Sequence, residues 1–102
     1  MGLRLRSSPQ TLTLLEVFLD QPTRWRHGYA VAQQTRLQSG TLYPMLMRLA
    51  KLKWLETRWE EPSEVGRPRH LYRLTSEGRE WAREELRAAR GRKSLRFARS
   101  EA

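Results

Sequence analysis

The residues of this 102-residue chain that are best suited to binding are cations and hydroxyls gathered in two short stretches. The first stretch contains Ser39, Gly40, Thr41, Tyr43, Pro44, Arg48 and Lys51. The second has Arg67 and Arg69 on either side of Pro68. Guanidinium, ammonium and hydroxyl groups, together with the free backbone N–H groups at a helix start, are the groups that contact phosphate oxygens. Both stretches are therefore candidate binding sites for a phosphate-bearing polymer.

No arrangement for covalent or metal chemistry accompanies these stretches. The chain has no cysteine, its serines lie outside nucleophile motifs, and it has no glycine-rich phosphate loop. His27 and His70 lack a second histidine or a carboxylate at metal-ligand spacing. We therefore expect no catalytic residue, no metal and no cofactor, and we do not expect an enzyme. For His27 a place at an interface or in the core is the expectation.

Composition favours one small domain with an anionic partner. Hydrophobic residues make up 38% of the chain, which permits one modest core. A net charge of +9 and a pI near 11.2 indicate a polyanionic partner, most often nucleic acid. No apolar run is long enough to span a membrane and no signal-peptide pattern opens the chain, so we expect a cytoplasmic protein.

The positive charge is concentrated at the C-terminal end. Residues 87–102 contain six basic residues and one acidic residue, which is more than half of the net excess. We expect residues 91–102 to form a disordered basic tail. Two roles stay open for it: keeping the chain soluble, or adding nonspecific affinity for DNA.

Apolar periodicity predicts three helices in the first half of the chain. After a flexible arm at residues 1–8, Ser8 and Pro9 are typical of a helix start, and apolar residues from Leu12 to Leu19 extend that helix over residues 9–21. Residues 28–35 predict a short second helix and residues 36–40 a turn. A third helix is expected over residues 41–53, with Pro44 in its first turn. Its predicted buried stripe is Leu42, Met45, Leu46, Leu49 and Leu52.

After Trp54 the period changes to two, which indicates strands. Leu55, Thr57 and Trp59 predict a half-buried strand, and Tyr72 and Leu74 mark one face of a second strand over residues 69–74. The turn-forming segment between them predicts a hairpin loop over about residues 62–70. A fourth helix is expected over residues 76–90, with Thr75 as its N-cap.

This order of elements is that of a winged helix-turn-helix. The predicted fold class is mainly α with a small β-hairpin: a DNA-binding domain over residues 9–75 and a dimerisation helix over residues 76–90. In such a fold the third helix enters the DNA major groove, and the hairpin loop contacts a neighbouring phosphate or the minor groove. A short polar turn between two helices also occurs in helical bundles that bind nothing.

Several strings of residues resemble the PadR family of bacterial transcriptional regulators. They are His27-Gly28-Tyr29, Ser39-Gly40-Thr41-Leu42-Tyr43-Pro44, Trp54-Leu55-Glu56, Gly66-Arg67-Pro68-Arg69 and Tyr72-Arg73-Leu74-Thr75-x-x-Gly78. The resemblance covers residues 9–90 and is to members with one short C-terminal helix. It implies a dimeric winged-helix repressor that binds palindromic operator DNA and is released by a small molecule or another signal. Lys53 departs from the pattern, because a glycine commonly stands there, so the turn is expected to be strained or differently shaped.

On this interpretation, double-stranded DNA is contacted by both candidate stretches, including Arg48, Lys51, Arg67 and Arg69. Alternatives stay open: an ordinary solvated helix face, a structural role for Tyr43, and a merely soluble hairpin loop. Two rival functions are a protein-interaction module without sequence-specific DNA binding, and RNA binding. The cations favour DNA, because a protein-docking surface is more often apolar.

An apolar stripe on the fourth helix predicts a homodimer. A palindromic operator requires a twofold protein. The fourth helix, which lies outside the winged core, is the expected interface, with the first helix as its partner. The residues expected there are Leu12, Leu15, Trp81, Leu86 and Ala89. The alternative for Trp81 is packing against the core of its own chain. The resemblance also implies that Trp81 lines a site for a small-molecule effector.

Overall fold

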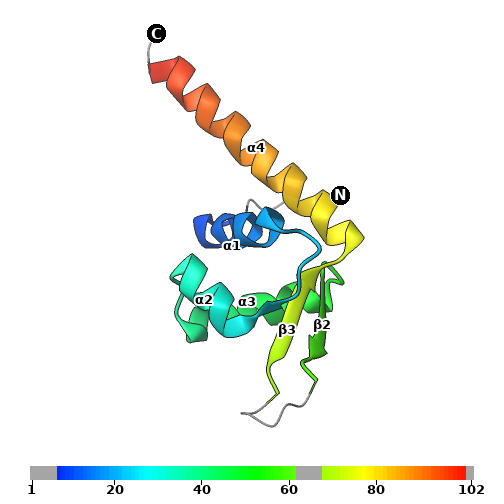
Figure 1. Cartoon of the computed structure of the whole chain (residues 1–102). Helices are drawn as coiled ribbons and strands as arrows, with labels where there is room; N and C mark the ends of the chain where they lie inside the picture. Colours follow the sequence, from blue (N-terminus) through cyan, green and yellow to red (C-terminus); the bar gives the residue numbers. More distant parts are fainter. Residues whose placement is uncertain (1–6, 62–67, 101–102) are drawn as a thin grey trace.

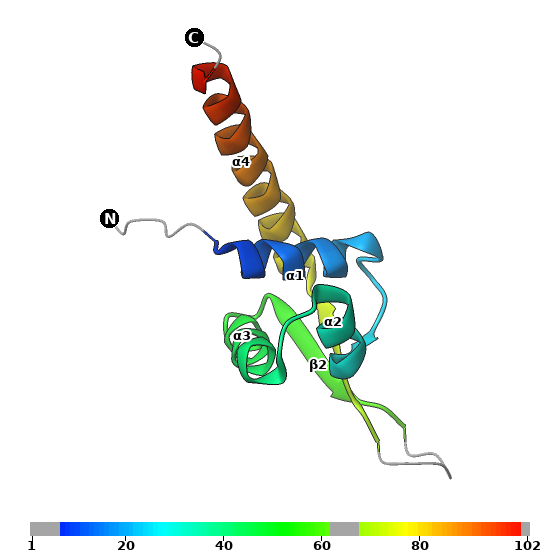
Figure 2. The ribbon, with the colours of Figure 1, turned by 90° about the vertical axis from the view of Figure 1, so that its left-hand side faces the viewer.

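The computed structural model describes residues 7–61 and 68–100 (Figure 1). Its elements are α1 (Pro9–Asp20), β1 (Arg26–His27), α2 (Gly28–Thr35), α3 (Ser39–Lys51), β2 (Leu55–Trp59), β3 (His70–Leu74) and α4 (Ser76–Ser100). β3 lies between β1 and β2 in an antiparallel sheet. The β2–β3 hairpin extends from one end of the helical body, and α4 extends from the other (Figure 2). The predicted winged helix-turn-helix fold is confirmed.

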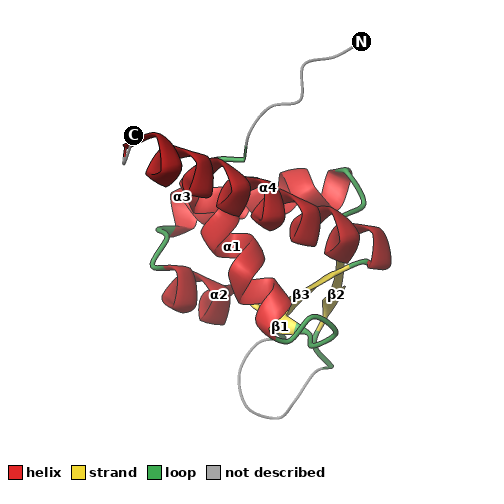
Figure 3. Ribbon diagram, turned by 90° about the horizontal axis from the view of Figure 1, so that it is seen from above, coloured by secondary structure: helices red, strands yellow, loops and turns green. Residues whose placement is uncertain are grey.

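One hydrophobic core joins the helices to the sheet. Helix α4 passes across α1 on one side of this core (Figure 3). Fully burying a large apolar side chain contributes about 1.5–3 kcal/mol to folding, so this cluster is the main source of stability. Its members are Leu14, Leu15, Phe18, Val31, Leu42, Leu46, Leu49, Leu55, Tyr72, Leu74, Ala82 and Leu86.

The start of α1 follows from its local sequence. The side chain of Ser8 accepts a hydrogen bond from the N–H of Thr11 at 3.1 Å, and Pro9 occupies the first turn. Because proline has no N–H, it loses no hydrogen bond at this position. The predicted N-cap and helix start are therefore confirmed.

The hairpin register divides the sheet into two faces. Residues directly opposite each other on paired strands point to the same side. We call the side that carries the buried Tyr72 and Leu74 the inner face and the opposite side the outer face. On the β2–β3 hairpin the inner face consists of Leu55, Thr57, Trp59, His70, Tyr72 and Leu74.

The helices cover only part of the inner face. Leu55 is buried, but Thr57 and Trp59 are exposed because the hairpin projects past the helical body (Figure 1). The prediction of a half-buried strand face is thus right for Leu55 alone. The two-residue strand β1 was not expected, because it is too short to show an alternating pattern.

Helix α3 begins two residues earlier than predicted, at Ser39, and ends at Lys51. Pro44 therefore lies in the second turn rather than the first, and its missing N–H leaves the carbonyl of Gly40 without its helical hydrogen bond. Leu52 was expected to be buried, but it is 51% exposed. It follows the last helical residue, so the helical stripe does not extend to it.

Helix α4 is longer than predicted. It continues to Ser100, so residues 91–100 are helical rather than a disordered tail. The arginine, lysine, alanine and leucine residues of this segment are strong helix formers, and their preference outweighs the roughly 1 kcal/mol cost of Gly91. Most of the expected hairpin loop, including Arg67, lies outside the described residues, as does most of the expected N-terminal arm.

The start of α4 is joined to the turn that follows α3. The N–H of Thr75 donates to the carbonyl of Trp54 at 3.0 Å, and the Thr75 hydroxyl donates to the carbonyl of Lys53 at 2.8 Å. The same hydroxyl accepts from the N–H of Gly78 at 2.9 Å. The rings of Trp54 and Trp81 stack with centroids 3.9 Å apart. Helix α4 therefore cannot shift without moving this turn.

Lys53 adopts the left-handed backbone conformation that glycine usually supplies, with φ of 64°. Its N–H donates to the carbonyl of Ala50, and the N–H of Trp54 donates to the carbonyl of Leu49, both at 3.0 Å. These two hydrogen bonds are those of a Schellman motif. The departure from glycine therefore leaves the shape of the turn intact and adds backbone strain.

We expect Lys53→Gly to raise the free energy of unfolding by about 0.5–1 kcal/mol. Glycine removes a left-handed strain of about 1–2 kcal/mol, part of which is offset by its greater freedom in the unfolded chain. Urea denaturation followed by circular dichroism measures the difference. Lys53→Ala is the control, because it removes the charge and keeps the Cβ atom. An equal gain in both variants would mean that charge, not backbone strain, is responsible.

Gly78→Ala is expected to destabilise the fold by about 2–4 kcal/mol. An added Cβ at Gly78 would overlap the carbonyl oxygen of Trp54. That oxygen cannot move away without breaking its hydrogen bond from the N–H of Thr75. The matched control is Gly91→Ala in the same helix, where a Cβ would meet nothing within 4 Å. That control should be neutral or stabilise the helix by up to about 1 kcal/mol. Thermal unfolding of the two variants compares them directly.

Candidate nucleic-acid interface

The outward face of α3 carries every residue that the sequence singled out on this helix. The buried face contains Leu42, Leu46 and Leu49, which pack into the core. The residues on the solvent side are Ser39, Gly40, Thr41, Tyr43, Pro44, Arg48 and Lys51, and each of them is exposed. The structure therefore brings together all of the first candidate stretch on one surface.

This surface is free of negative charge from its own helices. No acidic residue occurs between Asp20 and Glu56, a range that includes both α2 and α3. Within the part of the chain that the structure describes, Arg48 and Lys51 form no ion pair. Both cations are therefore available to an anionic partner.

The start of α3 presents backbone N–H groups to solvent. Gln38 is the N-cap residue, and its side chain makes no capping hydrogen bond. The first intrahelical bonds come from the N–H groups of Thr41 and Leu42, so those of Ser39 and Gly40 have no partner within the helix. A Cβ on Gly40 would meet nothing within 4 Å. Packing therefore does not require glycine here, whereas close approach of a ligand to the backbone favours it.

Tyr43 has a structural role as well as an exposed one. A Cβ added to Gly28 would lie 2.8 Å from the Tyr43 hydroxyl, so the tyrosine ring covers the start of α2. Burial, and to a smaller extent the nearby Tyr43, raises the pKa of Tyr72 on the inner face of the sheet. Tyr43 is nevertheless 38% exposed. It packs against α2 and still contributes to the surface of α3.

Two carboxylates of the hairpin have partners on the sheet. Glu60 lies 2.8 Å from Nε2 of His27, and this hydrogen bond is the main reason that the pKa of Glu60 is lowered. Glu56 accepts a hydrogen bond from Arg73 at 2.8 Å, and these two residues are opposite each other on the outer face. Glu56 thus has a cationic partner, and Glu60 has a hydrogen-bond partner. His27 is half-buried and belongs to this pairing.

The structure describes only part of the second candidate stretch. Arg69 is exposed, and its carbonyl accepts a hydrogen bond from the N–H of Glu60 at 2.7 Å, which extends the hairpin beyond β3. Arg67 lies outside the described residues. A contact between these arginines and DNA therefore stays a prediction.

Three further large side chains are exposed. Tyr29 on α2 and Met47 on α3 are each 71% exposed, and Trp59 on β2 is 66% exposed. Helical periodicity predicts an outward Met47, whereas sequence reasoning missed the exposure of Tyr29 and Trp59. The available signal was their position, Tyr29 at a helix start and Trp59 at the end of a strand, where a core does not extend.

One arginine is excluded from this surface. Arg26 on β1 is buried, and its Nη1 donates to the side chain of Gln34 on α2 at 3.1 Å. Burial is the main reason that the pKa of Arg26 is lowered. Its charge therefore lies under α2 rather than at the exposed face of α3.

The residues predicted for the dimer interface have different environments. Leu15 is fully buried and Leu86 is 8% exposed, so both belong to the core of their own chain and leave little or no surface for a partner. Trp81 is half-buried and stacks on Trp54, which is the alternative role that the sequence left open. Leu12 and Ala89 keep part of their surface exposed. An interface role stays a prediction for Leu12, Ala89 and Trp81, and an effector role stays a prediction for Trp81.

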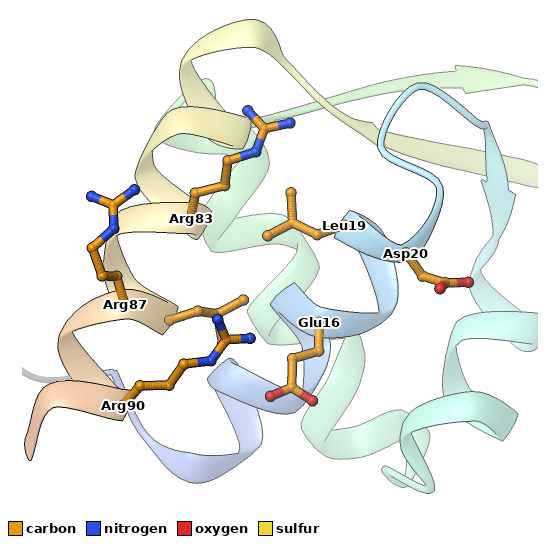
Figure 4. Close-up of a pocket in the computed structure, with 7 residues that line it drawn as sticks. Glu16, Leu19, Asp20, Arg83, Arg87 and Arg90 are labelled. Carbon is orange, nitrogen blue, oxygen red and sulfur yellow. The ribbon is translucent and has the colours of Figure 1, made fainter. Parts of the chain in front are cut away.

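A groove of about 570 Å³ lies between α1 and α4 (Figure 4). The carboxylates in it come from α1 and the guanidinium groups from α4. Among the residues that the structure describes, these charged side chains form no ion pair with one another. The lining residues are Glu16, Leu19, Asp20, Arg83, Leu86, Arg87 and Arg90.

The described ranges contain no candidate metal site and no candidate membrane-spanning helix. No group of three histidine, aspartate or glutamate side chains there is close enough to hold a metal ion. None of the helices there combines the length and the apolar composition needed to cross a membrane.

Comparison with known proteins relates both the sequence and the fold to one family. Residues 14–84 match the model of the PadR-like family of transcriptional regulators. Comparison with curated protein sequences gives no match. Similar solved structures include a Streptococcus mutans protein with 25% identity, covering 98% of this chain and 95% of that chain, with a TM-score of 0.74.

Two further solved structures carry the family name. A PadR family transcriptional regulator from Eggerthella lenta has 26% identity, covers 90% of this chain and 82% of that chain, and has a TM-score of 0.65. A PadR-like transcription factor from Bacteroides fragilis has 24% identity, covers 91% of this chain and 92% of that chain, and has a TM-score of 0.67. Because the family model matches more than half of the chain and the fold agrees, the chain belongs to the PadR-like family of transcriptional regulators.

Proposed function

We propose that this regulator binds palindromic operator DNA as a homodimer and acts as a repressor. In this proposal α3 enters the major groove and the hairpin contacts the adjacent backbone. The observation that carries it is the outward face of α3, where exposed cations, hydroxyls and unpaired N–H groups occur together without a carboxylate. An α-helix fits the major groove, and helix N-termini and guanidinium groups contact phosphate or base edges there.

Electrostatics support DNA over an acidic protein surface. The cations of α3 lie beside backbone N–H groups and a glycine with open space, an arrangement suited to a phosphate close to the main chain. Glu56 pairs with Arg73 on the outer face of the hairpin, and Glu60 is hydrogen-bonded to His27. These partners reduce the repulsion that the two carboxylates would exert on a polyanion.

A homodimer is supported by α4. One α3 reads one half-site, so a palindrome requires two copies related by a twofold axis. Much of α4 projects away from the body (Figure 2), and a projecting helix in water gains stability from a partner. The groove beside it has carboxylates on α1 and arginines on α4. A second copy docked there has complementary charges to offer.

Arg48→Ala is expected to weaken specific binding by about 1–3 kcal/mol and to leave the helicity unchanged. The probe is a duplex recovered by selection from a pool with a randomised centre, measured by fluorescence anisotropy. The control is Arg24→Ala, which removes an exposed arginine outside α3 and the hairpin. Equal losses in the two variants would indicate a general charge effect and contradict the assignment to Arg48.

The same measurement separates the proposal from its rivals. Duplex DNA should compete with the labelled probe far better than single strands or RNA of equal length. Equal competition by RNA, or no saturable duplex binding by the unaltered protein, would overturn the proposed function.

Ala89→Arg is expected to shift the protein from dimer to monomer in sedimentation and to weaken operator binding through lost avidity. Ala89 is only half-buried in its own chain, so the substitution tests the interface without filling the core. Glu80→Arg is the control, because nine residues along an α-helix place it on the opposite side of α4. A stable, folded dimer in Ala89→Arg would rule out this face of α4 as the interface.

A further inference from the structure

Trp59 is a large apolar side chain in a place where the core does not protect it. It ends β2, next to the hairpin loop, and is 66% exposed. Large exposed apolar surfaces on soluble proteins often mark a contact with a partner. The position of Trp59 in the fold indicates the kind of partner.

The ring of Trp59 is already fixed in orientation. One of its faces stacks on His70, with ring centroids 4.5 Å apart and an angle of 11° between the planes. The ring of His70 in turn contacts Tyr72, whose hydroxyl lies 3.1 Å from Nδ1 of His70. Tyr72 is part of the core. Because this row of rings is anchored, Trp59 loses little conformational freedom when a partner covers it.

The row leads from the hairpin to the recognition helix. Trp59, His70 and Tyr72 share the inner face of the sheet, and Tyr72 is near enough to Tyr43 of α3 for the two to interact electrostatically. Trp59 lies two residues beyond Thr57 along the strand, which is about 7 Å toward the loop. Trp59 therefore lies on the face of the sheet that also carries Tyr72, the neighbour of Tyr43.

The charges next to Trp59 lie on the opposite face of the hairpin. Glu60, the next residue, pairs with His27. On the other arm of the hairpin Arg69 is opposite Glu60, whose N–H donates to the Arg69 carbonyl, and the charge of Arg69 helps to lower the pKa of Glu60. Both charges thus belong to the face of the hairpin away from Trp59. The exposed ring of Trp59 is a neutral surface that fits the apolar sugar of a sugar–phosphate chain.

We propose that the open face of Trp59 packs on a deoxyribose of the DNA backbone beside the groove that α3 enters. The inference rests on the proposed function. In a duplex the faces of the bases are covered by stacking, so the apolar surface accessible to a ring at the groove edge is that of the sugars. The contact adds affinity without charge, beside the phosphate contact expected of Arg69.

The test compares the salt dependence of binding in several variants. Trp59→Ala is expected to lower affinity for the selected duplex roughly tenfold, because apolar burial is lost. The slope of log affinity against log salt should not change, since no counterion is released by a neutral contact. Arg69→Ala should reduce that slope by about one phosphate equivalent. Leu52→Ala, an exposed apolar residue after α3, is the matched control and should keep full affinity.

Two further measurements distinguish loss of the Trp59 contact from loss of folding. Trp59→Phe keeps a ring on His70 and should show a smaller loss than Trp59→Ala, with unchanged circular dichroism. The duplex-induced change in tryptophan fluorescence should be mostly absent in Trp59→Phe, because Trp54 and Trp81 stack on each other and Trp25 lies against Arg58 and Arg73.

The outcomes separate this inference from the proposed function. Saturable duplex binding by the unaltered protein, with unchanged affinity in Trp59→Ala, would overturn the Trp59 contact and leave the proposed function standing. A loss in Trp59→Ala that is larger for single strands than for duplex would also overturn it, since that result indicates stacking on bases. Absence of duplex binding in the unaltered protein would instead remove the proposed function itself.

Discussion

The attachment of α4 to the turn after α3 is the constraint on which the rest of the structure depends. Trp54 accepts a backbone hydrogen bond from Thr75, lies against Gly78 and stacks its ring on Trp81. Trp54 stands between the end of α3 and the start of β2, so one residue links three elements. The orientation of α3 relative to α4 follows from this contact. Any interface formed by α4 therefore also sets the position of α3.

The two faces of the hairpin carry different side chains: charged residues pair on the outer face, and aromatic rings lie on the inner face. Glu56 and Arg73 pair on the outer face of the hairpin, and Arg58 and Arg73 lie against the ring of Trp25. The inner face instead continues from the core through Tyr72 to Trp59. Glu56 is thereby paired with Arg73, and Glu60 is hydrogen-bonded to His27. The inner face carries no carboxylate on β2 or β3.

One part of helix α4 packs in the core, and the other part extends beyond it. Ala82 and Leu86 are buried in the core, whereas the far part of the helix projects from the body (Figure 1). Glu85 is also buried and accepts a hydrogen bond from Ser7 at 2.8 Å, which attaches the start of the chain to α4. The near part of the helix is therefore fixed by its own chain. The far part extends beyond the core (Figure 1).

The sequence by itself determined the order of the four helices and the hairpin, the buried stripe of α3 and the family. Those depend on short-range patterns: the apolar spacing of Leu42, Leu46 and Leu49, the Ser8–Pro9 helix start, and the strings around Tyr43 and Gly78. The sequence did not determine at which residue each apolar pattern stops being buried. Leu52 and Trp59 continue an apolar pattern and are exposed, because burial depends on whether another element covers them.

Only the tertiary structure decided the partners of residues that are far apart in the chain. The stacking of Trp81 on Trp54, the full burial of Leu15 and the pairing of His27 with Glu60 each join separate elements. No local pattern records such contacts, because they arise when the elements pack. Likewise, α4 extends past Gly91 because the many strong helix formers of that segment outweigh one glycine. The outward residues of α3 could be identified from sequence, since helical periodicity sets which side faces away from the core.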